Sequence, residues 1–290
     1  MLRGMLVGLV GEKGKRSVKA WLSGLRGWVA RRFHRYDAGA LKSQLKKMGV
    51  SDTDTLLVHG NFEANSGFRG TPSDLVEAFI DLVGHKGNLI MMSIPFRGSA
   101  YDYLEKNKPF YLNRTISMMG LMTEMLRRRP GTLRSLHPTH PVLAFGKDSR
   151  WIVEDHDKCL FPCGVGTPFD KLRQLKGKIL FFDVGFGAIT FFHFVEDLIK
   201  GKLPFPVYEE KLFSVSVVDG KGECRQVQTY AFTRGISRDT AKVEQELRRQ
   251  GKIGVGRVGN SRVLLVSAED VVSVMIDMVD HGNWPYGSVG

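Results

Sequence analysis

Two side chains with complementary proton chemistry lie three residues apart in the segment 190–196. His193 and Glu196 stand among apolar residues, and their i, i+3 spacing places both on one face of a helix. An imidazole beside a carboxylate is the minimum pair for general base catalysis, because the carboxylate fixes the tautomer and raises the basicity of the ring. The alternative interpretation is a hydrogen-bonded core histidine. The segment therefore contributes one candidate catalytic pair.

Two further loops concentrate polar side chains beside predicted strands. Residues 58–62 follow an apolar run, and residues 134–140 precede another. In layered α/β proteins, functional groups usually lie on loops at the strand ends. The polar or glycine positions of interest in these loops are His59, Gly60, Asn61, Ser135 and His137.

A zinc site is an alternative use of the histidines and cysteines. His137 and His140 are three residues apart, and His156, Cys159 and Cys163 follow at spacings of three and four. All five are ligands that zinc accepts. The spacing matches no standard finger, and the proline within the first pair argues against a helical pair of ligands. We expect no metal, with the zinc site kept as an open alternative.

Alternating predicted strands and helices must position these groups. Short apolar runs predict strands, and amphipathic stretches of about ten residues predict helices. The predicted strands are 55–58, 88–94, 141–145, 178–184, 212–218, 226–232 and 263–266. The predicted helices are 41–48, 73–83, 117–129, 190–200, 239–249 and 268–279, and Thr190 is the expected N-cap of the fourth. The pattern predicts an α/β fold, a layered α/β/α arrangement with a central mixed β-sheet and a small antiparallel hairpin turned at Asp219 and Gly220.

The first fifty residues hold most of the excess positive charge. They contain twelve Lys or Arg and two Asp or Glu, whereas the remaining 240 residues carry a net charge of only +2 out of the total of +12. A nucleic-acid enzyme would spread basic surface over its body, so no nucleic-acid partner is expected. We therefore expect a basic N-terminal extension, residues 1–38, and one domain over residues 39–290.

An amphipathic helix is predicted within this extension. Between residues 17 and 36, apolar side chains including Trp21 and Trp28 follow helical spacing and are flanked by cations. This pattern is typical of a helix lying on an anionic membrane surface, and equally of one packed on its own domain or on a partner subunit in a homodimer. No apolar run is long enough to span a bilayer. The three cysteines are too few for a secreted disulfide framework, so the expected location is cytoplasmic, peripheral on the inner face of the membrane if the helix binds lipid.

Seven short motifs, taken in order, resemble the aminoglycoside N3-acetyltransferase family. They are LLVH at 56–59, MGLMTE at 119–124, RSLHPTH at 134–140, DH at 155–156, GVGTP at 164–168, TFFHFVE at 190–196 and GVGRVG at 254–259. The resemblance covers roughly residues 40–280. It implies an acetyl-CoA-dependent N-acyltransferase with an α/β fold unlike that of the commoner GNAT enzymes.

The resemblance also implies roles for particular residues. His193 is the general base, Glu196 its orienting or amine-binding partner, and His137 a second catalytic candidate. The residues implied to contact the pantetheine arm or the thioester are His59, Gly60, Asn61, Phe62, Ser135 and Thr190. No cysteine or serine stands in a nucleophile motif, which favours direct transfer from acetyl-CoA over a covalent acyl-enzyme.

Several positions depart from the family pattern. Gly60 and Asn61 replace two serines, and Asp183 replaces a glycine at a strand end. Residues 100–114 hold two acidic and three basic side chains, a poor electrostatic match for the polycationic aminoglycosides that drug-inactivating members bind through acidic loops. We therefore expect the amine of an amino sugar as acceptor, either a glycan precursor or an aminoglycoside. The alternative is a catalytically retired binding or scaffold protein of the same fold.

Overall fold

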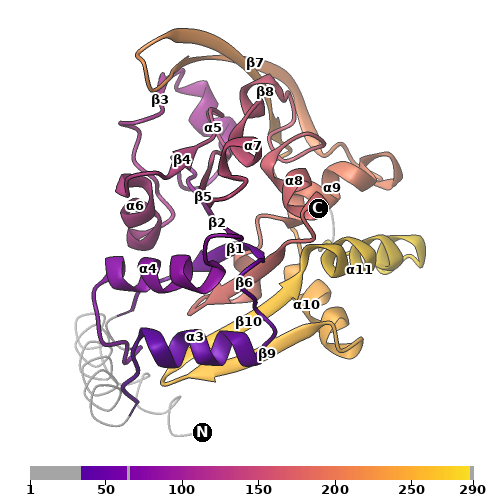
Figure 1. Ribbon diagram of the computed structural model, residues 1–290. Helices are drawn as coiled ribbons and strands as arrows, with labels where there is room; N and C mark the ends of the chain where they lie inside the picture. The colour runs from indigo at the N-terminus through magenta and orange to yellow at the C-terminus, as the bar shows by residue number, and fades with distance from the viewer. Residues whose placement is uncertain (1–33, 64–65, 288–290) are drawn as a thin grey trace, which may run out of the picture.

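The computed structural model describes residues 34–63 and 66–287, which form two sheets with helices around them (Figure 1). The predicted membrane-surface helix at 17–36 lies almost entirely outside the described residues. In the part that is described, Tyr36 is buried and hydrogen-bonds Ser261. Within the described residues, no helix is long and apolar enough to cross a bilayer.

A seven-stranded mixed sheet forms the centre of the molecule, in the order β4-β5-β2-β1-β6-β10-β9. Its strands are β1 (Thr55–Gly60), β2 (Asn88–Met92), β4 (Leu133–Arg134), β5 (Val142–Gly146), β6 (Lys178–Phe182), β9 (Ile253–Val258) and β10 (Ser261–Ser267). β1 pairs in parallel with β2 and β6, and the outer pairs are antiparallel. The predicted mixed sheet is confirmed.

Helices cover both faces of this sheet, as the layered prediction requires. One face packs against α3 (Ala38–Lys47), α4 (Pro72–Val83) and α6 (Leu121–Arg128). The other packs against α7 (Ser149–Val153), α8 (Pro168–Gln174), α9 (Phe192–Ile199), α10 (Thr240–Arg249) and α11 (Ala268–Asp280). Successive strand residues such as Leu56 and Leu57 alternate between the two cores, which explains why the central strands are apolar throughout.

A second, three-stranded sheet contains the predicted hairpin. β7 (Tyr208–Val218) and β8 (Cys224–Phe232) pair antiparallel, and β3 (Phe110–Tyr111) adds to β7 in parallel. The hairpin turns as expected at Asp219, whose backbone bonds to Glu223 and Gly222. This sheet packs with the short helix α5 (Ala100–Glu105) and arches over one end of the molecule (Figure 1).

Two predicted helix starts are wrong, and each has a local cause. The helix expected from residue 117 begins at Leu121, because Gly120 has a φ of +110° that breaks helical geometry. The helix expected from residue 190 begins at Phe192, after the 3₁₀ turns that include Phe186–Ala188. Thr190 is therefore not its N-cap, and that helix end has no side-chain cap among the described residues.

Candidate active site

His193 and Glu196 form the predicted pair on the first turn of α9. His193 Nδ1 lies 2.7 Å from Glu196 Oε2. A carboxylate oxygen only accepts a hydrogen bond, so Nδ1 must donate and the lone pair of the ring is on Nε2. The side chain of His193 is 22 % exposed and that of Glu196 is fully buried. The helix thus presents a basic nitrogen to solvent and holds the carboxylate behind it.

Arg238 completes this arrangement from the loop before α10. Its Nε lies 2.9 Å from each carboxylate oxygen of Glu196. Burial raises the pKa of Glu196, but the hydrogen bonds and charges of His193 and Arg238 outweigh burial and hold that pKa below its ordinary value. Glu196 therefore stays ionised in the interior. Arg238 lies 42 residues from Glu196 along the chain, and no local pattern in the sequence indicated it.

A pocket of about 210 Å³ opens beside His193, between the central sheet and the second sheet. The ring of Phe232, at the end of β8, stacks on the imidazole with 4.2 Å between ring centroids. The residues lining the pocket are Phe96, Gly98, Ser99, Ala100, His140, His193, Phe232, Thr233, Arg234, Gly235 and Arg238. The pocket thus joins residues from the loop after β2, the strand-entry loop before β5, α9 and the end of β8.

The second imidazole in this pocket is His140 rather than the predicted His137. His140 packs edge-on against Phe232, and its Nδ1 lies 3.0 Å from the Thr139 hydroxyl. Burial, followed by the neighbouring His193 and His156, holds the pKa of His140 well below its ordinary value, so the ring is neutral. A neutral imidazole can assist polar recognition in the pocket without repelling a cationic amine.

His137 is buried in a histidine cluster next to His140, whose backbone nitrogen lies 3.3 Å from His137 Nδ1, but His137 does not line this pocket. Its ring stacks on His156 with 4.5 Å between centroids. Both nitrogens of His156 have partners, the Ser135 hydroxyl at 2.9 Å and the Pro162 carbonyl at 3.0 Å. In the part of the chain that the structure describes, no group of three His, Cys, Asp or Glu side chains is placed to hold a metal ion. The cluster orders the strand-entry loop, with Ser135 fully buried inside it.

The first predicted loop lies at the carboxyl end of β1. His59 is buried and stacks on Phe181, and burial lowers its pKa to about 4. A side chain on Gly60 would come within about 3.1 Å of Met122 on α6, and the backbone of Asn61 bonds to Phe182. Phe62 packs against the α3–α4–α6 core. Of the predicted donor-binding residues, these four lie together, Thr190 is half-buried beside α9, and Ser135 belongs to the histidine cluster.

The acidic groups near the pocket already have cationic partners. Arg234 contacts Glu209 with Nε at 3.1 Å and Asp102 with Nη1 at 3.7 Å. Glu196 is held by Arg238, so two guanidinium groups and three carboxylates surround the pocket. No carboxylate lines the pocket itself among the described residues. With three carboxylates and two guanidinium groups around it, the pocket suits a ligand with one positive charge better than a ligand with several.

An imidazole oriented by a buried carboxylate and opening into a pocket is an arrangement that can accept a proton from a nucleophile. Comparison with known proteins assigns the family. The family described as aminoglycoside 3-N-acetyltransferase matches residues 57–280. An aminoglycoside N(3)-acetyltransferase VII of Streptomyces paromomycinus is 27% identical over 259 residues, covering 80% of this chain and 87% of that protein. An aminoglycoside N(3)-acetyltransferase-like prophage protein of Bacillus subtilis is 24% identical over 249 residues, covering 80% of this chain and 88% of that protein.

Solved structures share the fold. An AAC-IIIb structure in binary complex with CoASH superimposes with a TM-score of 0.72 at 22% identity, covering 88% of this chain and 99% of the other. AAC-VIa bound to sisomicin gives a TM-score of 0.70 at 22% identity, covering 86% and 98%. The chain belongs to the aminoglycoside 3-N-acetyltransferase family. It is thus an N-acetyltransferase that uses acetyl-CoA as donor, as the sequence motifs predicted.

Proposed function

We propose that this enzyme acetylates the amine of an amino sugar by direct transfer, with His193 as general base. The observation that carries the proposal is the hydrogen-bonded chain Arg238, Glu196 and His193 ending at the pocket. Because Glu196 holds the proton on Nδ1, Nε2 is free to accept a proton from the incoming amine. The new C–N bond replaces the C–S bond of the thioester, and the thiolate leaves with little assistance because thiol pKa values are near 8.5. Because His137 is buried and does not line the pocket, it has no proton-transfer role in this proposal.

The donor is proposed to bind at the carboxyl end of β1. Acetyl-CoA supplies the activated acetyl thioester, and the residues proposed to hold it are His59, Gly60, Asn61 and Phe62, with Thr190 near the thioester. His59 Nε2 is buried and has no hydrogen-bond partner within the described ranges. An unpaired buried polar atom costs free energy, so its presence at this edge fits a site that binds a polar ligand. Ser135 is left out, because its hydroxyl bonds to His156 inside the fold.

The acceptor is proposed to be an amino sugar with one amine, such as a glycan precursor. Two arginines already satisfy the three carboxylates around the pocket, so a polycation would have to compete with Arg234 for Asp102 and Glu209. The test is kcat/KM for glucosamine and for sisomicin, with thiol release as the readout. A higher kcat/KM for sisomicin would contradict this choice of acceptor and leave the transferase assignment standing.

The general base is tested by His193→Ala, with His281→Ala as the matched control because His281 is exposed on the surface. Removing a general base lowers turnover by about 10²–10⁴-fold. We expect that loss for the first variant only, with unchanged heat in a calorimetric titration with coenzyme A. Unchanged turnover would remove His193 from its role. No heat with the wild-type chain would instead favour a retired binding protein.

Residues 17–36 are proposed to bring the enzyme to an anionic membrane surface. The proposal depends on the apolar stripe with two tryptophans and on the net positive charge of the first fifty residues. The test is co-sedimentation with vesicles containing phosphatidylserine. The full chain should bind and a chain lacking residues 1–38 should not, and equal binding by the two would contradict the proposal.

A further inference from the structure

A second pocket, of about 670 Å³, lies between α6, β4 and α7. It shares no lining residue with the pocket at His193. Its volume is within the range of about 300–1,000 Å³ that small-molecule sites occupy. We call it the arginine pocket, and its lining residues are Leu112, Asn113, Arg127, Arg128, Thr132, Leu133, Arg134, Leu143, Arg150, Val153 and Glu154.

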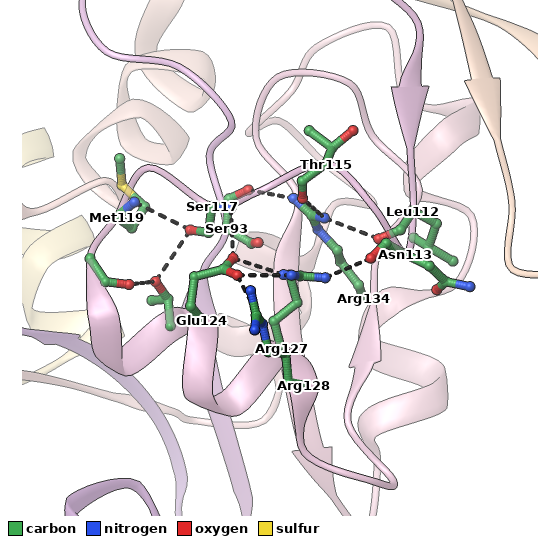
Figure 2. Close-up of polar contacts among 12 residues, drawn as sticks. Ser93, Leu112, Asn113, Thr115, Ser117, Met119, Glu124, Arg127, Arg128 and Arg134 are labelled. Carbon is green, nitrogen blue, oxygen red and sulfur yellow. Dashed lines mark hydrogen bonds and ion pairs between the residues drawn. The ribbon is translucent and has the colours of Figure 1, made fainter. Parts of the chain in front are cut away.

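Four guanidinium groups from three elements line the arginine pocket. On α6, Arg127 donates to both oxygens of the nearly buried Glu124, and Arg128 lies 3.5 Å from the same carboxylate (Figure 2). Arg134 comes from β4, and Arg150 from α7. Glu124 thus forms ion pairs with two of the four arginines.

Arg134 is a buried cation whose hydrogen bonds go to neutral groups. It is 9% exposed, and its Nη atoms donate to the carbonyl oxygens of Leu112, Thr115 and Ser93 (Figure 2). Its Nε has no partner within the described residues. Burial lowers the pKa of Arg134 to about 10, because the charge is poorly solvated and Arg127 lies nearby. Glu124 and the Phe110 ring, whose centroid lies 4.7 Å from Arg134 Cζ, offset part of the cost of this buried charge, and an anion in the pocket would offset more of it.

The other lining residues include one more arginine, an unpaired hydroxyl, several apolar side chains and one carboxylate, Glu154. Arg150 is exposed and its side chain makes no hydrogen bond or ion pair with the described residues. The hydroxyl of Thr132 is buried and unpaired within the same ranges. Leu112, Leu133 and Val153 add an apolar wall. Guanidinium groups bind phosphate oxygens in bidentate geometry, and apolar walls suit an organic group attached to the phosphate.

We propose that the arginine pocket binds a nucleotide-sized organic phosphate, at a site separate from the acetyl donor and the acceptor. The phosphate is held by Arg150 and Arg128 and supplies the counter-charge for Arg134. The organic portion lies against the apolar wall. This site does not depend on the proposed role of His193, and its test does not use catalytic activity.

The test is calorimetric titration of the full chain with ATP, without coenzyme A, because coenzyme A is itself a nucleotide-sized organic phosphate that would compete for the arginine pocket. We expect saturable binding that inorganic pyrophosphate displaces. Arg150→Gln should weaken ATP binding by about tenfold or more, since a charge-assisted contact to phosphate is lost. Because Arg150 is exposed and unpaired, this variant should fold normally. Arg173→Gln is the matched control, because Arg173 is paired with Glu269 and lines a different pocket.

Three results would overturn the proposal. The first is the absence of ATP binding to the wild-type chain. The second is equal ATP affinity in the wild-type chain, Arg150→Gln and Arg173→Gln. The third is a failure of pyrophosphate to displace ATP, which would exclude recognition through the phosphate groups.

Discussion

Replacing Glu196 by Gln should change the protonation of His193 while leaving the fold intact. The two side chains have the same shape, but the amide has one oxygen and one NH₂ group. Arg238 Nε sits 2.9 Å from both terminal positions and can only donate. Because Arg238 Nε is equally far from both positions, the amide oxygen can occupy the position of Oε2 and accept from both Arg238 Nε and His193 Nδ1. Nδ1 still donates, but the negative charge that stabilises the protonated ring is lost.

The expected loss follows from the missing charge. Without the carboxylate, the imidazolium that forms when His193 takes a proton from the acceptor amine is no longer stabilised by an ion pair. The corresponding carboxylate-to-amide change in a Ser-His-Asp triad lowers turnover about 10⁴-fold, and a general base contributes about 10²–10⁴-fold. We expect kcat to fall about 10³-fold, equivalent to about 4 kcal/mol of transition-state stabilisation. Affinity for coenzyme A should not change, because Glu196 is fully buried and is not among the residues proposed to hold the donor.

The assay is thiol release at saturating substrates, with Glu244→Gln as the matched control. Glu244 lies on α10 and pairs with Arg248 at the surface, so its variant should keep wild-type kcat. The unfolding midpoint of each variant shows whether the fold is retained. A kcat for Glu196→Gln within threefold of the wild-type value would refute the proposal that the charge of Glu196 supports His193 as general base.

Two further predictions concern stability. Arg238→Gln should lower the free energy of unfolding by about 3–5 kcal/mol at pH 7, since it leaves the buried Glu196 without its cation. The folded-state pKa of Glu196 is lowered, so its stabilising contribution is present above its unfolded value of about 4.3 and is lost as the pH falls below that value. The unfolding free energies of the variant and the wild type, measured in urea, should therefore converge only below about pH 4, as the pH falls through the lowered folded-state pKa of Glu196. The surface variant Arg248→Gln should lose less than about 1 kcal/mol at any pH. A difference for Arg238→Gln that is independent of pH would contradict this. Gly146→Ala should lower the free energy of unfolding by about 2–5 kcal/mol, because φ is +131° and the added carbon would meet the Gly87 carbonyl. Gly222→Ala, where φ is +89° and the space around the added carbon is open, should lower it by about 1–2 kcal/mol. Equal thermal shifts for the two variants would show that the close contact at Gly146 does not matter.

The layered arrangement could be predicted from the sequence because the central strands have a recognisable residue pattern. β1, β2 and β6 are buried on both faces, so each appears as a continuous apolar run. β9 was missed because Gly254 and Gly256 interrupt its apolar pattern, and a side chain at Gly256 would collide with Met48 on the end of α3. The two-residue strands β3 and β4 are too short for any periodicity to indicate.

The candidate site was predictable only where its residues share one helix. His193 and Glu196 stand one turn apart, so their contact follows from helical spacing. Arg238 and Phe232 reach the same place through tertiary packing, which spacing along the chain does not encode. For His137 and His140, closeness in the sequence did not predict a shared position in the structure. Both stand in one motif, yet the loop sends His137 into the interior and His140 to the pocket.

The stacking of Phe232 on His193 brings a residue of the second sheet into contact with the candidate catalytic residue. His193 lies on α9, which packs against the central sheet, whereas Phe232 lies at the end of the long hairpin formed by residues 208–232. A chain whose central layers have assembled but whose hairpin is still detached would carry its base on an open surface with no pocket around it. Regain of turnover during refolding would then report hairpin docking, a step later than the appearance of most of the secondary structure.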